Sequence, residues 1–392
     1  MHINKSLKTI LLTIFSIAFM STFTIGSENE SDLLFSSLRQ QAMGGISTAT
    51  SESDAALYQN PAGLSNLGGF HLKFPRLRAM LGTEGLEKMQ DVSDISSEDG
   101  DESAQLDMLQ ALVPMDQIFG FGLYPLVSVS MPGLAAGIYV DSAFSAALTR
   151  RTSPTLHVIG QIDASGMVGI SDDFEILGEE ISIGATFKYI SRSKIYNENT
   201  GELFFELGQG DILANINGLQ EDRPNFFSME GFGVDIGFLK PLDGIDGNVG
   251  LVIKNIGASL EGEMSLKDDD GNYSTTTVTG EIPVIAKLGF SVEQDFEFVP
   301  VVGSFLGEAT FGIDYEVISD ESSMYKKLHM GFEKEIMFLK LRGGLNQGYV
   351  VGGFGLDLYI LHLNYVYNTY EAGEEIGMDP KSFHTLEIGV LF

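Results

Sequence analysis

The segment His384-Thr385-Leu386-Glu387-Ile388-Gly389-Val390-Leu391-Phe392 decides the fold of this chain. His384, Leu386, Ile388, Val390 and Phe392 fall on one side of a period-two pattern, and mostly polar or small residues fall on the other. A strand of this kind can place one face against lipid and the other against the inside of a barrel. We therefore interpret Leu386, Ile388, Val390 and Phe392 as the apolar face of a strand that closes a transmembrane β-barrel.

The same alternation recurs along residues 181–189 and in successive segments after residue 231. In one such segment Phe232, Val234 and Ile236 alternate with Gly233 and Asp235. Several polar faces carry charges in mid-strand: Lys188, Asp235, Lys254, Lys287, Glu293, Asp314, Glu316 and Asp357. The outer face of a soluble β-sandwich and the wet lumen of a barrel tolerate such charges equally, so alternation alone leaves both architectures open.

The start of the chain has the pattern of a secretory signal peptide. Lys5 and Lys8 precede the uncharged stretch 10–24, and the small residues Gly26 and Ser27 follow. That stretch is about 15 residues long, whereas a spanning helix needs roughly 20, although a retained N-terminal anchor is the alternative. We predict that residues 1–27 are a signal peptide, which together with the last strand favours the barrel.

Composition excludes several classes of partner. The chain has 392 residues and a formal charge of −31, and removal of residues 1–27 takes away two lysines and no acid, which gives −33. A protein this acidic is not expected to neutralise nucleic-acid phosphates. After the signal no window has the ~18 uncharged apolar residues of a membrane helix, so a membrane location requires strands. The absence of Trp counts against an aromatic girdle, although Phe and Tyr can replace it.

No motif indicates catalysis or a cofactor. The six histidines are scattered without metal-ligand spacing, and no G-x-S-x-G elbow is present. The acidic run 268–271 is interpreted as a hairpin loop rather than a calcium site, because no bidentate Glu follows at the right distance. We therefore predict a protein that is not an enzyme and that carries no metal or other cofactor.

Connections between the expected strands differ in length. Short turns are predicted near residues 334–336 and 360–361, and longer polar links at residues 266–277, 319–326 and 368–381. Two larger insertions break the pattern, a helical one at about 82–113 and an irregular one at about 203–228. Each insertion could be a lid, a partner-binding arm or a solvated excursion. Alternation of short and long connections is typical of a transmembrane barrel, with the long ones outside.

A compact segment without strand alternation lies between the signal and the first strand. Gly44 and Gly45 permit a tight bend, and Asp54 is placed to cap a short helix at residues 55–58. Asn60 and Pro61 end that helix and favour an extended or turn conformation.

This segment resembles the N-terminal plug of the FadL/TodX family of outer-membrane transporters and of its wider group, which includes PorV-like proteins. The resemblance rests on Met43-Gly44-Gly45, on residues 54–58 (DAALY) and on residues 60–64 (NPAGL), about 25 residues in all. It implies an all-β, antiparallel barrel of about 14 strands (residues 69–392) whose lumen is blocked by a small hatch (residues 28–68). The residues implied to shape the hatch are Gly44, Gly45, Asp54, Tyr58, Asn60, Pro61, Ala62 and Gly63.

The resemblance also implies a function. We expect a transport protein in the outer membrane of a Gram-negative-type envelope that admits hydrophobic small molecules such as long-chain fatty acids. Its partners would be membrane lipid, the hydrophobic ligand and the barrel assembly machinery. The alternative is a PorV-like or structural barrel that binds a protein partner through its long loops. Uptake predicts an apolar groove that leads to the hatch, whereas partner binding predicts a tightly plugged lumen and a broad exposed patch.

Overall fold

The computed structural model describes residues 36–50, 53–83, 110, 113, 115–150, 152, 155–176, 178–198, 203–206, 225–268, 270–295, 308–319, 323–358 and 361–390. The expected signal peptide, most of both expected insertions and Phe392 lie outside these ranges. Among the described residues no helix has the length and apolar character needed to cross a membrane.

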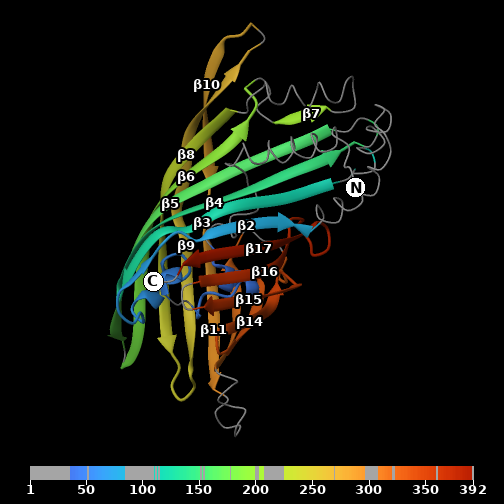
Figure 1. The fold of residues 1–392 in the computed structure, drawn as a ribbon. Coiled ribbons are helices and arrows are strands. Elements are labelled where there is room, and N and C mark those ends of the chain that lie inside the picture. Colours follow the sequence, from blue (N-terminus) through green and yellow to red (C-terminus); the bar gives the residue numbers. More distant parts are fainter. Residues whose placement is uncertain are drawn as a thin grey trace.

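Fourteen antiparallel strands of the described residues close a barrel (Figure 1), which confirms the predicted all-β fold. Each pairs with the next in chain order, and the last pairs with the first from Phe383 opposite Gly82 to Ile388 opposite Leu77. The strands are β2 (Leu77–Gly82), β3 (Met115–Met131), β4 (Leu134–Thr149), β5 (Thr155–Ile176), β6 (Glu179–Tyr196), β8 (Asn225–Pro241), β9 (Gly247–Lys267), β11 (Ile285–Asp295), β12 (Glu308–Ile318), β13 (Leu328–Ile336), β14 (Leu339–Asn346), β15 (Tyr349–Leu358), β16 (Leu361–Glu371) and β17 (Pro380–Val390).

Three short strands extend this sheet. The strands β1 (His71–Lys73) and β10 (Tyr273–Glu281) precede β2 and β11 across breaks that contain Pro75 and Pro283. Proline has no N–H to donate to a neighbouring strand, so it interrupts the ladder at both places. The strand β7 (Phe204–Glu206) pairs with the start of β5.

The two ends of the barrel differ in their connections. At one end, here called the turn end, strands are joined by residues 132–133, 177–178, 242–246, 296–307, 337–338 and 359–360. The opposite, loop end carries the connections 83–114 and 197–224. The predicted turn at 334–336 is displaced, because those residues complete β13 and the turn falls at residues 337–338. Long connections of such barrels face outward from the cell, so the turn end faces the periplasm.

The wall buries charged side chains on its inner face and exposes apolar side chains on its outer face, the reverse of a soluble protein. Charged residues inside the barrel are buried, with Asp235 at 1% and Lys188 at 3% exposure, whereas the outward Phe232 is 56% exposed. On β17, Thr385 and Glu387 are buried while Leu386, Ile388 and Val390 face outward. A soluble sandwich would bury the opposite set, so the wall spans a membrane, and barrels of this kind occupy the outer membrane of Gram-negative bacteria. Further outward apolar residues are Ile159, Val168, Ile170, Phe187, Leu288, Phe311 and Phe332.

This orientation gives a direct test on the lipid face. Phe232→Arg is expected to destabilise the barrel by about 2–4 kcal/mol, because the change places a charge against hydrocarbon. Thr276→Arg is the control, because Thr276 lies on the exposed strand β10 beyond the closed wall and should change stability little. Urea titrations of both variants in lipid vesicles measure the difference, and equal stabilities would contradict the assigned lipid face.

The ribbon formed by β9 and β10 extends beyond the barrel at the loop end (Figure 1). Residues 266–277, expected to be a polar link, are mostly strand, because the three threonines at positions 275–277 have β-branched side chains that suit a pleated surface. The turn itself is residues 268–272, in which Asp268 accepts hydrogen bonds from the backbone N–H groups of Asp270 and Asn272. These bonds lower the pKa of the Asp268 carboxyl and use its oxygens within the loop, as expected for a hairpin.

Candidate functional site

The segment between residues 36 and 67 lies inside the barrel and packs against opposite parts of its wall. Its elements are α2 (Leu38–Ala42) and the 3-10 helices η1 (Ser53–Leu57) and η2 (Pro61–Leu64). The helix α2 contacts β14, β15 and β16, whereas η2 contacts β5, β6 and β8. Figure 1 shows these helices, in blue, among the strands. Ala42, Leu57 and Leu64 are fully buried, so the segment fills the bore at this level.

The bend at Gly44 and Gly45 docks on β13 and β14. Both glycines have positive φ, +70° and +93°, a conformation that residues with a Cβ rarely adopt. A Cβ on Gly45 would lie 2.7 Å from Nδ1 of His329, and one on Gly44 would overlap backbone atoms of the wall. The carbonyl oxygen of Gly44 lies 2.9 Å from His329 Nδ1, within hydrogen-bond distance. The two glycines are therefore required both for the turn and for close approach to the wall.

Asp314 of β12 anchors the next part of the segment. Its Oδ2 accepts hydrogen bonds from the backbone N–H groups of Ser47 and Thr48, at 2.8 and 2.9 Å, and from the Thr48 hydroxyl at 2.8 Å. Asp314 is 1% exposed and Thr48 is 0% exposed, so water does not compete for these bonds. A carboxylate projecting from the wall thus satisfies two backbone donors that no helix or strand of the segment satisfies.

Asn60 holds the second half of the segment. Its amide Nδ2 donates to the carbonyl oxygen of Thr48 at 2.7 Å and to that of Phe238 on β8 at 3.2 Å. Its Oδ1 accepts from the N–H of Ala62, so Asn60 caps η2 while Pro61 occupies the first position. The expected helix at residues 55–58 is shifted, because η1 begins at Ser53 and Asp54 lies within it rather than before it.

A belt of glycines in nine consecutive strands receives the segment. At each of them an added Cβ would come within 3.1 Å of an atom of residues 42–64. Several of these glycines lie on the polar face of the alternating pattern, but the pattern does not indicate this role. The glycine belt has one residue from each strand of the closed wall between β5 and β15, so β7 and β10 contribute none. It consists of Gly169, Gly184, Gly237, Gly250, Gly289, Gly312, Gly331, Gly344 and Gly353.

Removal of the Asp314 anchor should loosen the segment without opening the wall. Asp314→Ala leaves the Ser47 and Thr48 N–H groups buried without their acceptor, which should cost about 2 kcal/mol or more locally. Cleavage within residues 36–68 by an added protease should accelerate accordingly, while the folded barrel resists. Asp172→Ala is a control on an exposed carboxylate of β5. Equal cleavage rates for D314A, D172A and the parent chain would contradict the anchoring role.

Elsewhere, charged side chains on the inner face of the wall pair with one another. Lys188 Nζ lies 2.7 Å from Asp235 Oδ1 and donates to Asn255 Oδ1 at 2.6 Å. Lys287 pairs with Glu316 at 2.7 Å. Because a buried charge without a partner is costly, the pairing allows these charges to be buried on the inner face of the wall.

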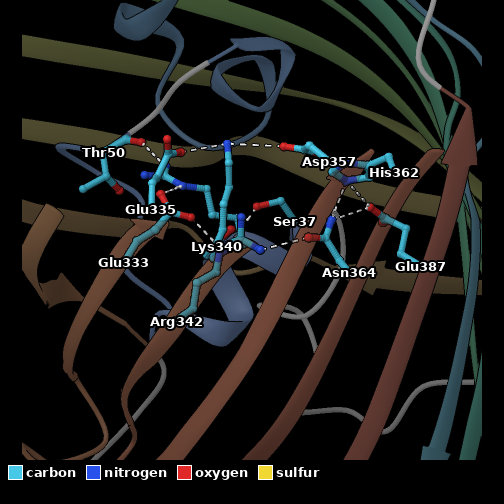
Figure 2. A network of polar contacts seen from close by, with 12 residues as sticks. Ser37, Thr50, Glu333, Glu335, Lys340, Arg342, Asp357, His362, Asn364 and Glu387 are labelled. Carbon is cyan, nitrogen blue, oxygen red and sulfur yellow. Dashed lines mark hydrogen bonds and ion pairs between the residues drawn. The ribbon is translucent and has the colours of Figure 1, made fainter. Parts of the chain in front are cut away.

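A cavity of about 420 Å³ lies between the N-terminal segment and the wall. The strand positions that contribute to it, such as Lys340 at the start of β14 and His362 at the start of β16, lie toward the turn end. Figure 2 shows the polar network on one side of it, from Glu333 and Arg342 to Asn364 and Glu387. The lining residues are Ser37, Leu38, Arg39, Ala55, Tyr58, Gln59, Lys73, Arg76, Arg78, Tyr124, Pro125, Lys340, Arg342, Asp357, His362, Asn364 and Glu387.

Comparison with solved structures identifies the architecture. A TodX monoaromatic hydrocarbon channel (deltaS2 mutant) matches with a TM-score of 0.50 and 15% identity over 92% of this chain and 98% of that one. This chain has the TodX-type barrel fold. The Ralstonia pickettii toluene transporter TbuX (TM-score 0.48, 12% identity) covers 91% of this chain and 97% of its own. The Pseudomonas putida toluene transporter TodX (TM-score 0.41, 11% identity) covers 94% and 98%. No protein-family model and no curated protein sequence matches.

The fold brings most of the predicted hatch residues together. Gly44, Gly45 and Asn60 contact the wall or cap the segment, and Pro61, Ala62 and Gly63 form η2. Tyr58 is buried and packs edge-on against Tyr124 and Tyr139, with ring centroids 5.2 and 5.1 Å apart. The side chain of Asp54 and the whole of Phe392 lie outside the residues that the structure describes. Among the described residues no cluster of three or more potential metal ligands occurs.

The sequence did not lead us to predict that cationic residues gather at one cavity. Lys73, Arg76 and Arg78 fall within six residues of a chain that has only 23 lysines and arginines. That local concentration was a usable signal. Arg39, Lys340 and Arg342 come from distant parts of the chain, and only the closed barrel brings them to the same cavity.

Proposed function

We propose that this chain is an outer-membrane transport protein that admits hydrophobic small molecules, such as long-chain fatty acids, through its barrel, with residues 28–68 as a movable hatch. The observation that carries the proposal is the seating of residues 42–64 on the glycine belt, which blocks the bore within an otherwise continuous wall. A greasy solute cannot cross a polar outer leaflet unaided, and a plugged barrel offers it a route that excludes bulk water.

The TodX-type fold supports this proposal. The TodX variant with a TM-score of 0.50 is a monoaromatic hydrocarbon channel, so we include aromatic hydrocarbons as a second solute class for this chain. The similar structures are transport channels rather than enzymes, which is consistent with a protein that is not an enzyme.

A PorV-like or structural role is the second candidate, and one observation favours it. The segment is packed so closely that Thr48, Asn60 and Ala62 have 0% exposure, which is the tightly plugged lumen expected of a barrel that binds a protein partner. The exposed β9–β10 ribbon at the loop end would then present part of the partner surface.

Two measurements separate these functions. Mass spectrometry of lipid extracts from the purified protein should detect a fatty acid or other hydrophobic solute that a barrel of similar size, prepared in the same way, does not retain. A deletion strain should take up long-chain fatty acids or toluene more slowly, and plasmid-borne parent chain should restore the rate. Unchanged uptake of both solutes would contradict transport and leave the partner-binding role.

A further inference from the structure

We infer that the cavity at the turn end binds an oxyanion headgroup, a carboxylate or a phosphate monoester, through Arg76 and Arg78. This site lies on the periplasmic side of the N-terminal segment and has no counterpart in the motifs found from the sequence. The inference goes beyond the proposed transport, because it concerns binding and does not require that the hatch moves.

More basic than acidic residues line the cavity. Six basic residues line the cavity, against two carboxylates, in a chain with a formal charge of −31. Three more carboxylates pair with these cations: Glu333 with Arg39 and Arg342, Glu335 with Lys340, and Asp141 with Arg78. Basic side chains are thus concentrated at this point of a strongly acidic protein. The six basic residues are Arg39, Lys73, Arg76, Arg78, Lys340 and Arg342.

Arg76 supplies a guanidinium that the protein engages only weakly. Its one ion pair among the described residues joins Nη1 to Glu387 Oε1 at 3.7 Å, longer than a hydrogen bond. Its backbone is held in place, because its N–H donates to the carbonyl oxygen of Pro125 and its own carbonyl oxygen accepts from the N–H of Tyr124. The Arg76 side chain is 17% exposed, so a ligand can reach it. A planar guanidinium with available donors suits two-point binding of a carboxylate or phosphate.

Arg78 and Tyr124 supply donors without acceptors. Nε of Arg78 and the hydroxyl of Tyr124 are buried and have no hydrogen-bond partner within the described part of the chain. Both residues line the cavity, and the Arg78 guanidinium lies over the Tyr124 ring at 4.1 Å from its centroid. Buried donors without acceptors are unfavourable. Both atoms are closed off from the cavity surface, so an oxyanion would satisfy them after a small shift of these side chains.

The size and lining of the cavity suit a small amphiphile. A volume of about 420 Å³ is within the range of ligand sites. Leu38, Ala55 and Pro125 add apolar surface beside the charges, where a short alkyl chain could lie. Because the cavity is at the turn end, the headgroup would be reached from the periplasm.

Calorimetric titration of the full chain in non-ionic detergent tests the site, with hexanoate, hexyl phosphate and hexanol as probes. At least one of the two anions should bind more tightly than hexanol, and added salt should weaken that binding. Arg76→Gln should weaken anion binding about tenfold or more, since a charge-assisted contact is lost. Arg76→Lys retains the charge, so its anion affinity should lie between those of the parent chain and Arg76→Gln. Lys240→Gln removes a cation from outside the cavity and should bind like the parent.

The two anions distinguish the source of the headgroup. Preference for hexanoate indicates a carboxylate solute, and preference for hexyl phosphate indicates a lipid-type phosphate. Equal binding of hexanol and the anions, or unchanged anion binding by R76Q, overturns the inference. Circular dichroism and resistance of the barrel to detergent unfolding establish that each variant is folded. Transport is not measured in this titration, so a failure of the proposed transport would leave its result unchanged.

Discussion

The Gly237→Leu variant is expected to keep its barrel and lose its plug. A Cβ at Gly237 would overlap Oδ1 of Asn60 and lie 2.9 Å from Cδ of Pro61, and leucine adds three further carbons in that direction. Neither neighbour can move independently, because Asn60 is fixed by the carbonyl oxygens of Thr48 and Phe238. Overpacking of about 3 kcal/mol or more should therefore unseat residues 47–62. Conductance across a planar bilayer should rise strongly over that of the parent chain.

Gly166→Leu is the matched control for this experiment. Gly166 lies on β5 with no atom within 4 Å of an added Cβ, on the side of the strand that faces away from the lumen. The Gly166→Leu variant should therefore keep the low conductance of the parent chain. Closed G237L channels in a demonstrably folded barrel would show that the segment does not depend on the glycine belt for its position.

A disulfide between the segment and the wall is expected to abolish transport reversibly. Ala42 of α2 and Val366 of β16 lie in one buried cluster with Leu38, so the two cysteines of the A42C/V366C variant would be neighbours. Mass spectrometry of the oxidised protein establishes that the bridge has formed. The parent chain has no cysteine, so this bridge would be the only one in the protein. If the hatch must leave its seat for a solute to pass, oxidation should stop uptake and a reductant should restore it. The single variants A42C and V366C control for the substitutions themselves.

The period-two pattern of the sequence predicted the wall because lipid and lumen act on alternate residues of every strand. The faces assigned to Phe232 and Asp235, and to Leu386 and Glu387, are those of the structure. Strand ends were predicted less well. The sequence predicted a polar link at Ser274–Thr277, whereas these residues belong to β10 and extend the β9–β10 ribbon. Polarity alone does not separate an exposed strand from a loop.

The contents of the lumen could not be predicted from the sequence in the same way. Whether Gly184 and Gly237 are ordinary small residues or a seat for Pro61 depends on what lies within the barrel, which no local pattern encodes. The cavity depends likewise on closure of the barrel, which sets Arg78 of β2 beside Glu387 of β17, more than 300 residues away, at 3.1 Å. The N-terminal motif marked the segment but did not reveal its contacts.

The initial rate of solute uptake into vesicles that contain A42C/V366C, measured before and after reduction, tests most directly whether the segment gates the barrel. Oleate and toluene serve as solutes, and empty vesicles give the background. We expect background rates for the oxidised protein and parent-like rates for at least one solute after reduction. Equal rates above background in the two states would contradict a hatch that moves, and background rates in both states, with the parent chain equally inactive, would contradict transport itself.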